Sequence, residues 1–437
     1  MTHPADVPLS EIAHDLRAGR LSAVELTRAH LDRIAIRDGA IRAFVHLAAE
    51  DALSAAARAD TAFADGRDLG PLHGIPFAVK DLIDVGGWPV RGGSRLYADR
   101  IAARTAPVVA RLLAGGAVPL GLVATYELAT VGPDPGALYP QPRNPRATDR
   151  ITGGSSSGSA AAVAAGMVRL ALGTDTGGSV RSPSAYCGVT GLKPTFGALS
   201  TEGVLPLSPS LDHVGILAAT AADAVHAWRA LGGSATGTIQ GRIGYVRGWA
   251  GDATDLLALL DDAARGLAKA GHPVDVVALP DYAAIEEAGL VLIQTEQLAI
   301  HGAALRDHPE RFGPMSRETL GSGYALDANA LAAARACAAE TRRAVDAALD
   351  GHVALILPTT MAPAPRFADF ADFAASGVVW TAMRTIPFNM TGHPAITVPM
   401  GKIDGMPMGL QIVGRHGDEA TILALASAFE TAGRAAG

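Results

Sequence analysis

A serine that follows two glycines is the first residue of this sequence that could act as a nucleophile. Ser179 comes directly after Gly177 and Gly178, and an apolar run at residues 167–172 precedes this stretch. The run predicts a buried strand, so the glycines fall where the strand ends in a turn. Glycines let a ligand approach the main chain, and their N–H groups with that of Ser179 could bind one oxygen. The stretch predicts an oxyanion hole beside a hydroxyl, although Gly-Gly-Ser alone is also typical of an ordinary turn.

Two earlier segments carry groups that could assist such a serine. Lys80 lies at the end of a short apolar segment at residues 74–81, and Ser155 belongs to a Gly/Ser-rich run before a predicted helix at residues 160–165. A lysine at a strand end is usually charged and solvated. Burial would lower its pKa, and the neutral amine could then accept a proton. Lys80 is therefore a candidate base.

In their order and spacing these segments resemble the amidase signature family. The resemblance is densest over residues 74–215 and returns at residues 389–399 and 409–414. It implies an α/β fold in which a mixed β-sheet is sandwiched between α-helices. It also implies an amide hydrolase that needs no cofactor and acts through a Ser-Ser-Lys triad.

The resemblance further implies a role for each residue of the site. Ser179 is expected to attack an amide carbonyl while Ser155, after a cis peptide bond, passes the proton to neutral Lys80. The other residues implied are the oxyanion-hole donors Thr176, Gly177 and Gly178, the supporting Asp175, and the substrate-binding candidates Tyr126, Gly154 and Arg181. Arg181 could instead pair with an acid in the scaffold. The remaining pocket walls are expected from residues 132–150 and from segments near Thr295 and Met383.

Three functions remain open at this point. The first is an amidase that hydrolyses a small or medium carboxamide to a carboxylic acid and ammonia or an amine. The second is the glutaminase (A) subunit of a tRNA-dependent Asp/Glu amidotransferase, which resembles this sequence over the same core. Ser182-Pro183-Ser184 departs from the Gln-Pro-Ala that usually follows the arginine in such subunits. The third is a non-catalytic scaffold with the same fold, which would not require an intact triad.

A different nucleophile is suggested by residues 154–158, which fit the pattern Gly-x-Ser-x-Gly. In an α/β-hydrolase this pattern would make Ser156 the nucleophile, on a turn directly after a strand. The preceding residues 144–150 are polar and interrupted by Pro145, so we expect no strand there and reject this interpretation.

Composition restricts the classes of partner. The net charge is −7 and there are no Lys/Arg runs, which argues against a nucleic-acid surface. The two cysteines lie 150 residues apart, so neither a disulfide framework nor a metal-ligand cluster is expected. No signal core or membrane-length apolar run occurs, which favours a cytoplasmic protein with a small amide substrate and no membrane partner. The sequence is compatible with a homodimer.

The elements that must position these residues alternate between helices and strands. Ser22 and Glu25 form a capping box that predicts a helix start, and Ser10 is expected to cap the helix before it. Residues 132–150 are expected to be a long loop. Longer helices are expected around residues 290–305 and 327–349. No linker or repeat occurs, so we expect a single domain over residues 1–437.

Overall fold

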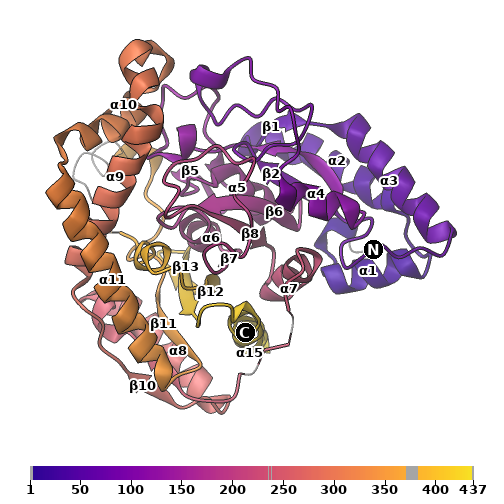
Figure 1. Ribbon diagram of the computed structural model, residues 1–437. Coiled ribbons are helices and arrows are strands. Elements are labelled where there is room, and N and C mark those ends of the chain that lie inside the picture. Colours follow the sequence, from indigo (N-terminus) through magenta and orange to yellow (C-terminus); the bar gives the residue numbers. More distant parts are fainter. Residues whose placement is uncertain (1–2, 235, 238, 371–381, 436–437) are drawn as a thin grey trace.

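An 11-stranded β-sheet runs through the middle of the computed structural model, which describes residues 3–234, 236–237, 239–370 and 382–435 (Figure 1). In spatial order the strands are β1 (Phe44–Leu47), β3 (Val118–Val123), β2 (Pro76–Lys80), β6 (Leu170–Asp175), β8 (His213–Ala218), β7 (Thr190–Lys193), β12 (Ala395–Ile403), β13 (Met406–Val413), β11 (Ala354–Pro358), β9 (Ile243–Tyr245) and β10 (Val274–Val276). β2 is parallel to β3 and β6, and β9 is parallel to β10 and β11, whereas the other neighbours are antiparallel. The expected mixed sheet is confirmed.

Helices cover both faces of this sheet. The helices of the described residues are α1 (Leu9–Arg17), α2 (Ala23–Ile41), α3 (Ala49–Ala64), α4 (Pro107–Ala114), α5 (Ser157–Ala164), α6 (Arg181–Cys187), α7 (Ala221–Ala230), α8 (Thr254–Lys269), α9 (Tyr282–Asp307), α10 (Pro314–Gly321), α11 (Ala328–Asp350), α14 (Pro387–Met390) and α15 (Glu419–Ala435). Two neighbouring residues of β11 show this. Ile356 belongs to a hydrophobic cluster with residues of α8 and α15. Leu357 belongs to a second cluster with residues of α9 and α11. Because successive strand side chains point to opposite faces, the sheet is sandwiched as expected.

Side chains at the helix starts explain where several helices begin. Ser22 and Glu25 form the predicted capping box at the start of α2. Asp281 and Asp327 cap the two long helices α9 and α11. α9 extends beyond the expected range of 290–305, whereas α11 matches the expected range of 327–349 to within one residue. The expectation for Ser10 is wrong. The structure starts α1 at Leu9, two residues before the start that a Ser10 cap implies. The Leu9 N–H donates to the Asp223 carboxylate of α7, so the acceptor comes from a distant part of the chain.

The segment at residues 132–150 is not the unstructured loop that its composition suggested. Its second half forms a two-stranded hairpin of β4 (Arg143–Asn144) and β5 (Ala147–Ile151), separate from the large sheet. Asn144 stabilises it by donating to the carbonyls of Ile151 and Tyr186 at 3.0 Å each. A strand therefore does precede Gly154, contrary to the sequence-based expectation.

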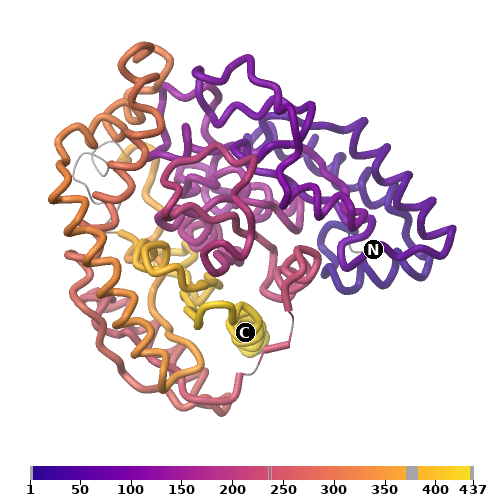
Figure 2. Tube along the Cα trace, viewed as in Figure 1, coloured from indigo at the N-terminus to yellow at the C-terminus, as the bar shows by residue number. Residues whose placement is uncertain are grey.

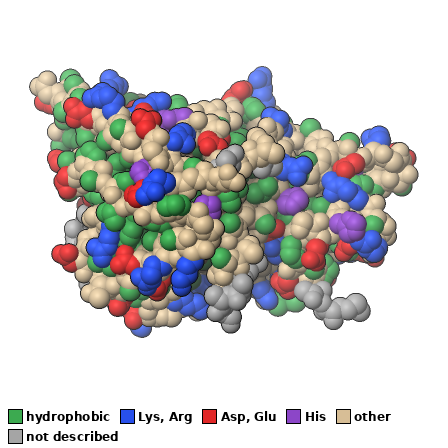
Figure 3. Space-filling model, turned by 90° about the horizontal axis from the view of Figure 1, so that it is seen from below, with side chains coloured by type: hydrophobic (Ala, Val, Ile, Leu, Met, Phe, Trp, Pro, Cys, Tyr) green, Lys and Arg blue, Asp and Glu red, His purple; other side chains and the backbone are tan. Residues whose placement is uncertain are grey.

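In Figure 2 the start of the chain lies at the right of the view, beside α1, and its end lies in the lower middle, at α15. α15 packs beside α7, and the Ala221 N–H at the start of α7 donates to Glu430 of α15 at 2.9 Å. On the face shown in Figure 3, Lys and Arg side chains are scattered among Asp and Glu. Within the described part of the chain, no helix is both long and apolar enough to cross a membrane. The single-domain organisation stays a prediction.

Candidate active site

Lys80, the last residue of β2, places its amine among three hydroxyl groups. Its Nζ lies 2.8 Å from Ser155 Oγ, 3.0 Å from Ser156 Oγ and 2.7 Å from Thr174 Oγ1. The lysine is completely buried. Burial holds its pKa well below that of a free lysine, although two nearby carboxylates act in the opposite direction. The environment therefore favours the neutral amine.

The protons of this cluster can be assigned by counting donors and acceptors. The Ser156 hydroxyl donates to the Thr174 carbonyl at 3.0 Å, so it can only accept from Lys80. A neutral amine has two N–H groups and one lone pair. If Ser156 and the Thr174 hydroxyl accept the two N–H groups, the lone pair is left for the Ser155 hydroxyl. The cluster thus has a place for a proton to pass from Ser155 to Lys80.

Ser179 lies at the edge of a cavity beyond the end of β6. The described residues that line the cavity are Tyr126, Ala129, Thr130, Val131, Gly132, Ile151, Gly153, Gly154, Ser155, Thr176, Gly177, Gly178, Ser179, Ser182, Tyr186, Leu207, Ile293, Phe370 and Met383. Residues from the expected wall segments are among them, although Ile293 lines the cavity in place of Thr295. None of these described lining residues carries a charged side chain. The walls therefore suit an uncharged group.

Asp175, the last residue of β6, shapes the turn that carries Ser179. Its carboxylate accepts the N–H groups of Gly178 at 2.9 Å, Val180 at 3.0 Å and Arg181 at 3.3 Å. Burial disfavours the carboxylate, but Arg181, Lys193 and Asn389 together outweigh burial and lower the pKa of Asp175. The Gly178 amide is thus already occupied, which corrects its assignment to the oxyanion hole. Thr176, Gly177 and Ser179 are the amides of this turn that make no hydrogen bond to Asp175.

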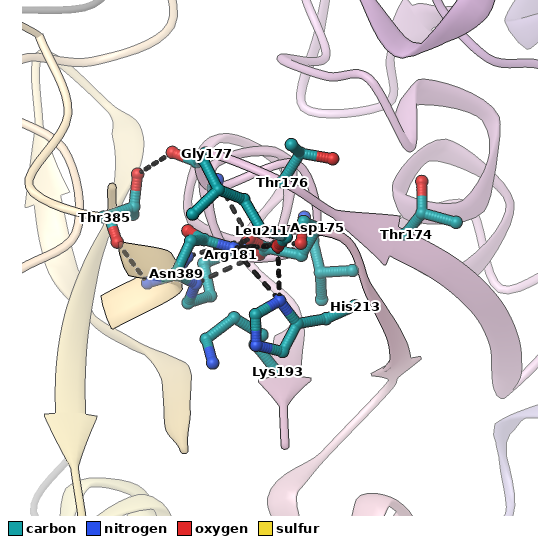
Figure 4. A network of polar contacts seen from close by, with 12 residues as sticks. Thr174, Asp175, Thr176, Gly177, Arg181, Lys193, Leu211, His213, Thr385 and Asn389 are labelled. Carbon is teal, nitrogen blue, oxygen red and sulfur yellow. Dashed lines mark hydrogen bonds and ion pairs between the residues drawn. The ribbon is translucent and has the colours of Figure 1, made fainter. Parts of the chain in front are cut away.

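Arg181 is completely buried behind this turn, with a partner for every guanidinium nitrogen (Figure 4). Nε and Nη2 donate to the Asp175 carboxylate at 3.0 and 2.8 Å, and Nη2 also donates to Asn389 at 2.6 Å. Nη1 donates to Gln411 Oε1 and to the Thr385 carbonyl. Arg181 does not line the cavity, so its assignment as a substrate-binding residue is corrected in favour of the scaffold role.

Tyr126 and Gly154 form one wall of the cavity together. A Cβ at Gly154 would come within 2.2 Å of the Tyr126 ring, and one at Gly132 within 2.6 Å, so both glycines are needed for the ring to fit. The Tyr126 N–H donates to the carbonyl of Ser155 at 3.1 Å. The peptide bond between Gly154 and Ser155 is cis, as the resemblance implied.

Ser156 does not occupy the position that a nucleophile would need. It is completely buried, does not line the cavity, and its hydroxyl bridges Lys80 and the main chain of Thr174. Although β5 precedes it, this strand belongs to the small hairpin and not to the large sheet. The expectation that no strand precedes Gly154 was therefore wrong. The burial of Ser156 and its absence from the cavity lining are what argue against it as the nucleophile.

Three supporting residues were missed by the sequence interpretation. Thr385 donates its hydroxyl to the Gly177 carbonyl at 2.6 Å, and Asn389 donates to the Asp175 carbonyl at 2.9 Å. Asp212 accepts from the Thr176 hydroxyl at 2.5 Å, and burial raises the pKa of this acid to about 6. All three are distant in sequence from the residues they hold, so no local spacing could have indicated them.

Away from the cavity, Asp346, His393 and His416 form a group that could hold a metal ion.

Comparisons with known proteins gave matches that cover most of this chain. A family model described as Amidase matches residues 25–423. The A subunit of the glutamyl-tRNA(Gln) amidotransferase from Chloroflexus aggregans is 36% identical, covering 95% of this chain and 94% of that protein. A chain from a vestigial complex described as revealing the origins of an s-triazine catabolic enzyme has a TM-score of 0.89 and 32% identity, over 98% of this chain and 99% of that one. The peptide amidase of Stenotrophomonas maltophilia has a TM-score of 0.79 and 30% identity, over 98% and 97%.

Proposed function

Since the chain belongs to the amidase signature family of hydrolases, we propose that it hydrolyses an uncharged carboxamide through an acyl-enzyme on Ser179. The observation that carries this proposal is the completely buried Lys80 amine, 2.8 Å from Ser155 Oγ, beside the cavity that Ser179 and Ser155 line. A buried neutral amine with a hydroxyl partner is a base that can activate a serine.

In the proposed reaction, Ser179 Oγ attacks the carbonyl carbon of the amide. Its proton passes to Ser155 as Ser155 gives its own proton to the lone pair of Lys80. The amides of Thr176, Gly177 and Ser179 stabilise the negative oxygen of the tetrahedral intermediate, where losing one donor typically costs about 2.7–4 kcal/mol. The carbon–nitrogen bond then breaks, and the proton returns through Ser155 to the leaving nitrogen. Water, activated by the same relay, releases the carboxylic acid.

The uncharged cavity walls favour an uncharged substrate over glutamine. Glutamine carries an ammonium and a carboxylate, and a charge that leaves water needs a partner of opposite charge. The described lining residues offer none. A small or medium aliphatic or aromatic carboxamide meets no such cost, and the apolar side chains of Leu207, Ile293 and Met383 can contact it.

A panel of simple amides on the purified chain tests this proposal. Ammonia release from propionamide, benzamide and glutamine should be measured with the parent protein, with Ser179→Ala and with the matched control Ser54→Ala, at an exposed position of α3. We expect release from at least one uncharged amide, complete loss in Ser179→Ala, and no change in Ser54→Ala. Normal turnover by Ser179→Ala would remove the nucleophile assignment.

The second candidate is the glutaminase subunit of an amidotransferase, which is favoured by the names of the 36%-identical relatives. It predicts a chain that is inactive alone and hydrolyses glutamine when candidate partner subunits and charged tRNA are added. That outcome, with no hydrolysis of uncharged amides by the chain alone, would replace the first proposal. A non-catalytic scaffold would instead be inactive under both conditions.

A further inference from the structure

Asp346, His393 and His416 come together at the surface where α11 meets two loops. Asp346 lies in the last third of α11, His393 between α14 and β12, and His416 between β13 and α15. One potential ligand atom of each side chain lies within 4.8 Å of the other two. None of the three lines the catalytic cavity. The fold therefore assembles two imidazoles and a carboxylate from positions up to 70 residues apart.

The hydrogen bond on the far side of the His416 ring determines what this ring offers. Its Nε2 lies 2.9 Å from the carbonyl of Thr391, and a carbonyl only accepts, so Nε2 carries the proton. In the neutral ring Nδ1 then presents a lone pair. Nδ1 lies 3.8 Å from Asp346 Oδ1, beyond hydrogen-bond distance. A lone pair and a carboxylate oxygen that face each other are stabilised by a cation between them.

His393 is held by the same threonine. Its Nδ1 lies 2.9 Å from the Thr391 hydroxyl, and its Nε2 lies 3.0 Å from Asp346 Oδ1. A hydroxyl can donate or accept, so it can hold either neutral tautomer. Without an ion, the Asp346 carboxylate can only accept, so His393 Nε2 carries the proton and donates to it. Binding of an ion requires the other tautomer, in which Nδ1 donates to the Thr391 hydroxyl and the Nε2 lone pair is left for the ion. Thr391 thus orients both rings, as residues behind metal ligands commonly do.

Burial and access also suit an ion. The His393 side chain is completely buried. The side chains of Asp346 and His416 are 51% and 27% exposed. An ion could therefore enter from solvent and keep water as a further ligand.

We propose that Asp346, His393 and His416 bind one divalent transition-metal ion, with Zn²⁺ as the best match, at a site separate from the catalytic serine. Two imidazoles, one carboxylate and a water make up the four ligands that Zn²⁺ prefers, at about 2.0–2.2 Å from the metal. Mg²⁺ and Ca²⁺ prefer oxygen ligands and fit this set poorly. The ion would link α11 to the loop that follows Asn389. Asn389 in turn donates a hydrogen bond to the Asp175 carbonyl.

Metal binding can be measured without any amide substrate, so the result does not depend on the proposed function. The full chain should be treated with a chelator, dialysed, and mixed with Zn²⁺, Co²⁺ or Mg²⁺. We expect one tightly bound Zn²⁺ per chain, the visible absorption of four-coordinate Co²⁺, and a Tm increase of about 3 °C at a hundredfold excess of Zn²⁺ over its Kd. Mg²⁺ should produce no increase.

Variants assign the binding to these residues. His416→Gln and Asp346→Asn replace exposed or half-exposed side chains and should each abolish the Zn²⁺-induced Tm shift. His352→Gln is the control, because His352 also pairs with an aspartate, Asp275 at 3.3 Å, but belongs to no group of three potential metal ligands among the described residues. The proposal is overturned if the chelator-treated parent chain binds no Zn²⁺, or if both variants bind it as the parent does. A protonated His416 that pairs with Asp346 would give the first of these results.

Discussion

Arg181 holds Asp175 with two nitrogens, Nε at 3.0 Å and Nη2 at 2.8 Å, and neither side chain is reached by solvent. The same carboxylate accepts the N–H groups of Gly178 and Val180. One buried ion pair therefore sets the path of the main chain on both sides of Ser179. Changes to this turn and to the surroundings of Lys80 should have measurable effects on stability and turnover.

Asp175→Asn should unfold more easily and lose activity. Removing one partner of a buried ion pair leaves the other charge uncompensated, which typically costs about 3–5 kcal/mol. The measurement is the urea midpoint together with amide turnover. Asp262→Asn is the control, because its pair with Arg265 is exposed and should contribute less than about 1 kcal/mol. Equal midpoints for the two variants would contradict the importance of the pair.

The two serines next to Lys80 should have different effects when changed to alanine. Ser155→Ala should lower kcat by about 10²–10⁴-fold, the usual range for lost acid–base catalysis, with little change in stability. Ser156→Ala removes hydrogen bonds to Lys80 and to the main chain of Thr174, and should cost about 1–3 kcal/mol of stability. Steady-state kinetics and urea unfolding on both variants separate the roles. A fully active Ser155→Ala enzyme would exclude the proton relay.

The contribution of Lys80 to stability should depend on pH in a defined direction. Its folded pKa is lowered by burial, whereas the unfolded value is about 10.4. Between these two values the unfolded chain binds one proton more, so this lysine favours folding increasingly as pH rises, and the contribution is lost as pH falls. The free energy of unfolding of the parent relative to Lys80→Met should therefore grow by about 1.4 kcal/mol per pH unit in that window.

Urea unfolding of both proteins at pH 7, 8 and 9 checks this slope. Exposed Lys269→Met is the control and should show a constant difference from the parent. A constant difference for Lys80→Met as well would mean that Lys80 is charged in the folded protein. Lys80→Arg should be inactive at every pH, because a guanidinium does not deprotonate.

Gly178→Ala should displace the turn that carries Ser179. A Cβ at this position would lie 2.1 Å from Thr385 Oγ1, and the φ angle of 131° is one that residues with side chains rarely adopt. We expect kcat to fall by about 10²–10³-fold, as when an oxyanion donor is lost. Gly197→Ala is the control, since its φ is also positive but no atom lies within 4 Å of the added Cβ. Similar kcat values in both variants would show that the contact with Thr385 is unimportant.

The local sequence alone determined much of this protein. The apolar segment before Lys80 predicted a strand that ends there, and β2 does end at Lys80. A strand was also correctly predicted before the glycines, but β6 (Leu170–Asp175) lies three residues later than the predicted range of 167–172. The capping box at Ser22 correctly predicted the start of α2. These features could be read because strand ends, turns and helix caps depend on residues close together in the chain.

Only the tertiary structure decided how the site is supported and where Gly178 points. Thr385 and Asn389 contact the turn from more than 200 residues away. β5 forms from a polar segment, and Asn144 of β4 stabilises it by donating to the carbonyls of Ile151 and Tyr186. Arg181 has the same sequence context whether it faces a substrate or a buried acid. Pairings of this kind depend on which segments the fold brings together, and a chain without an assembled core gives no local sign of them.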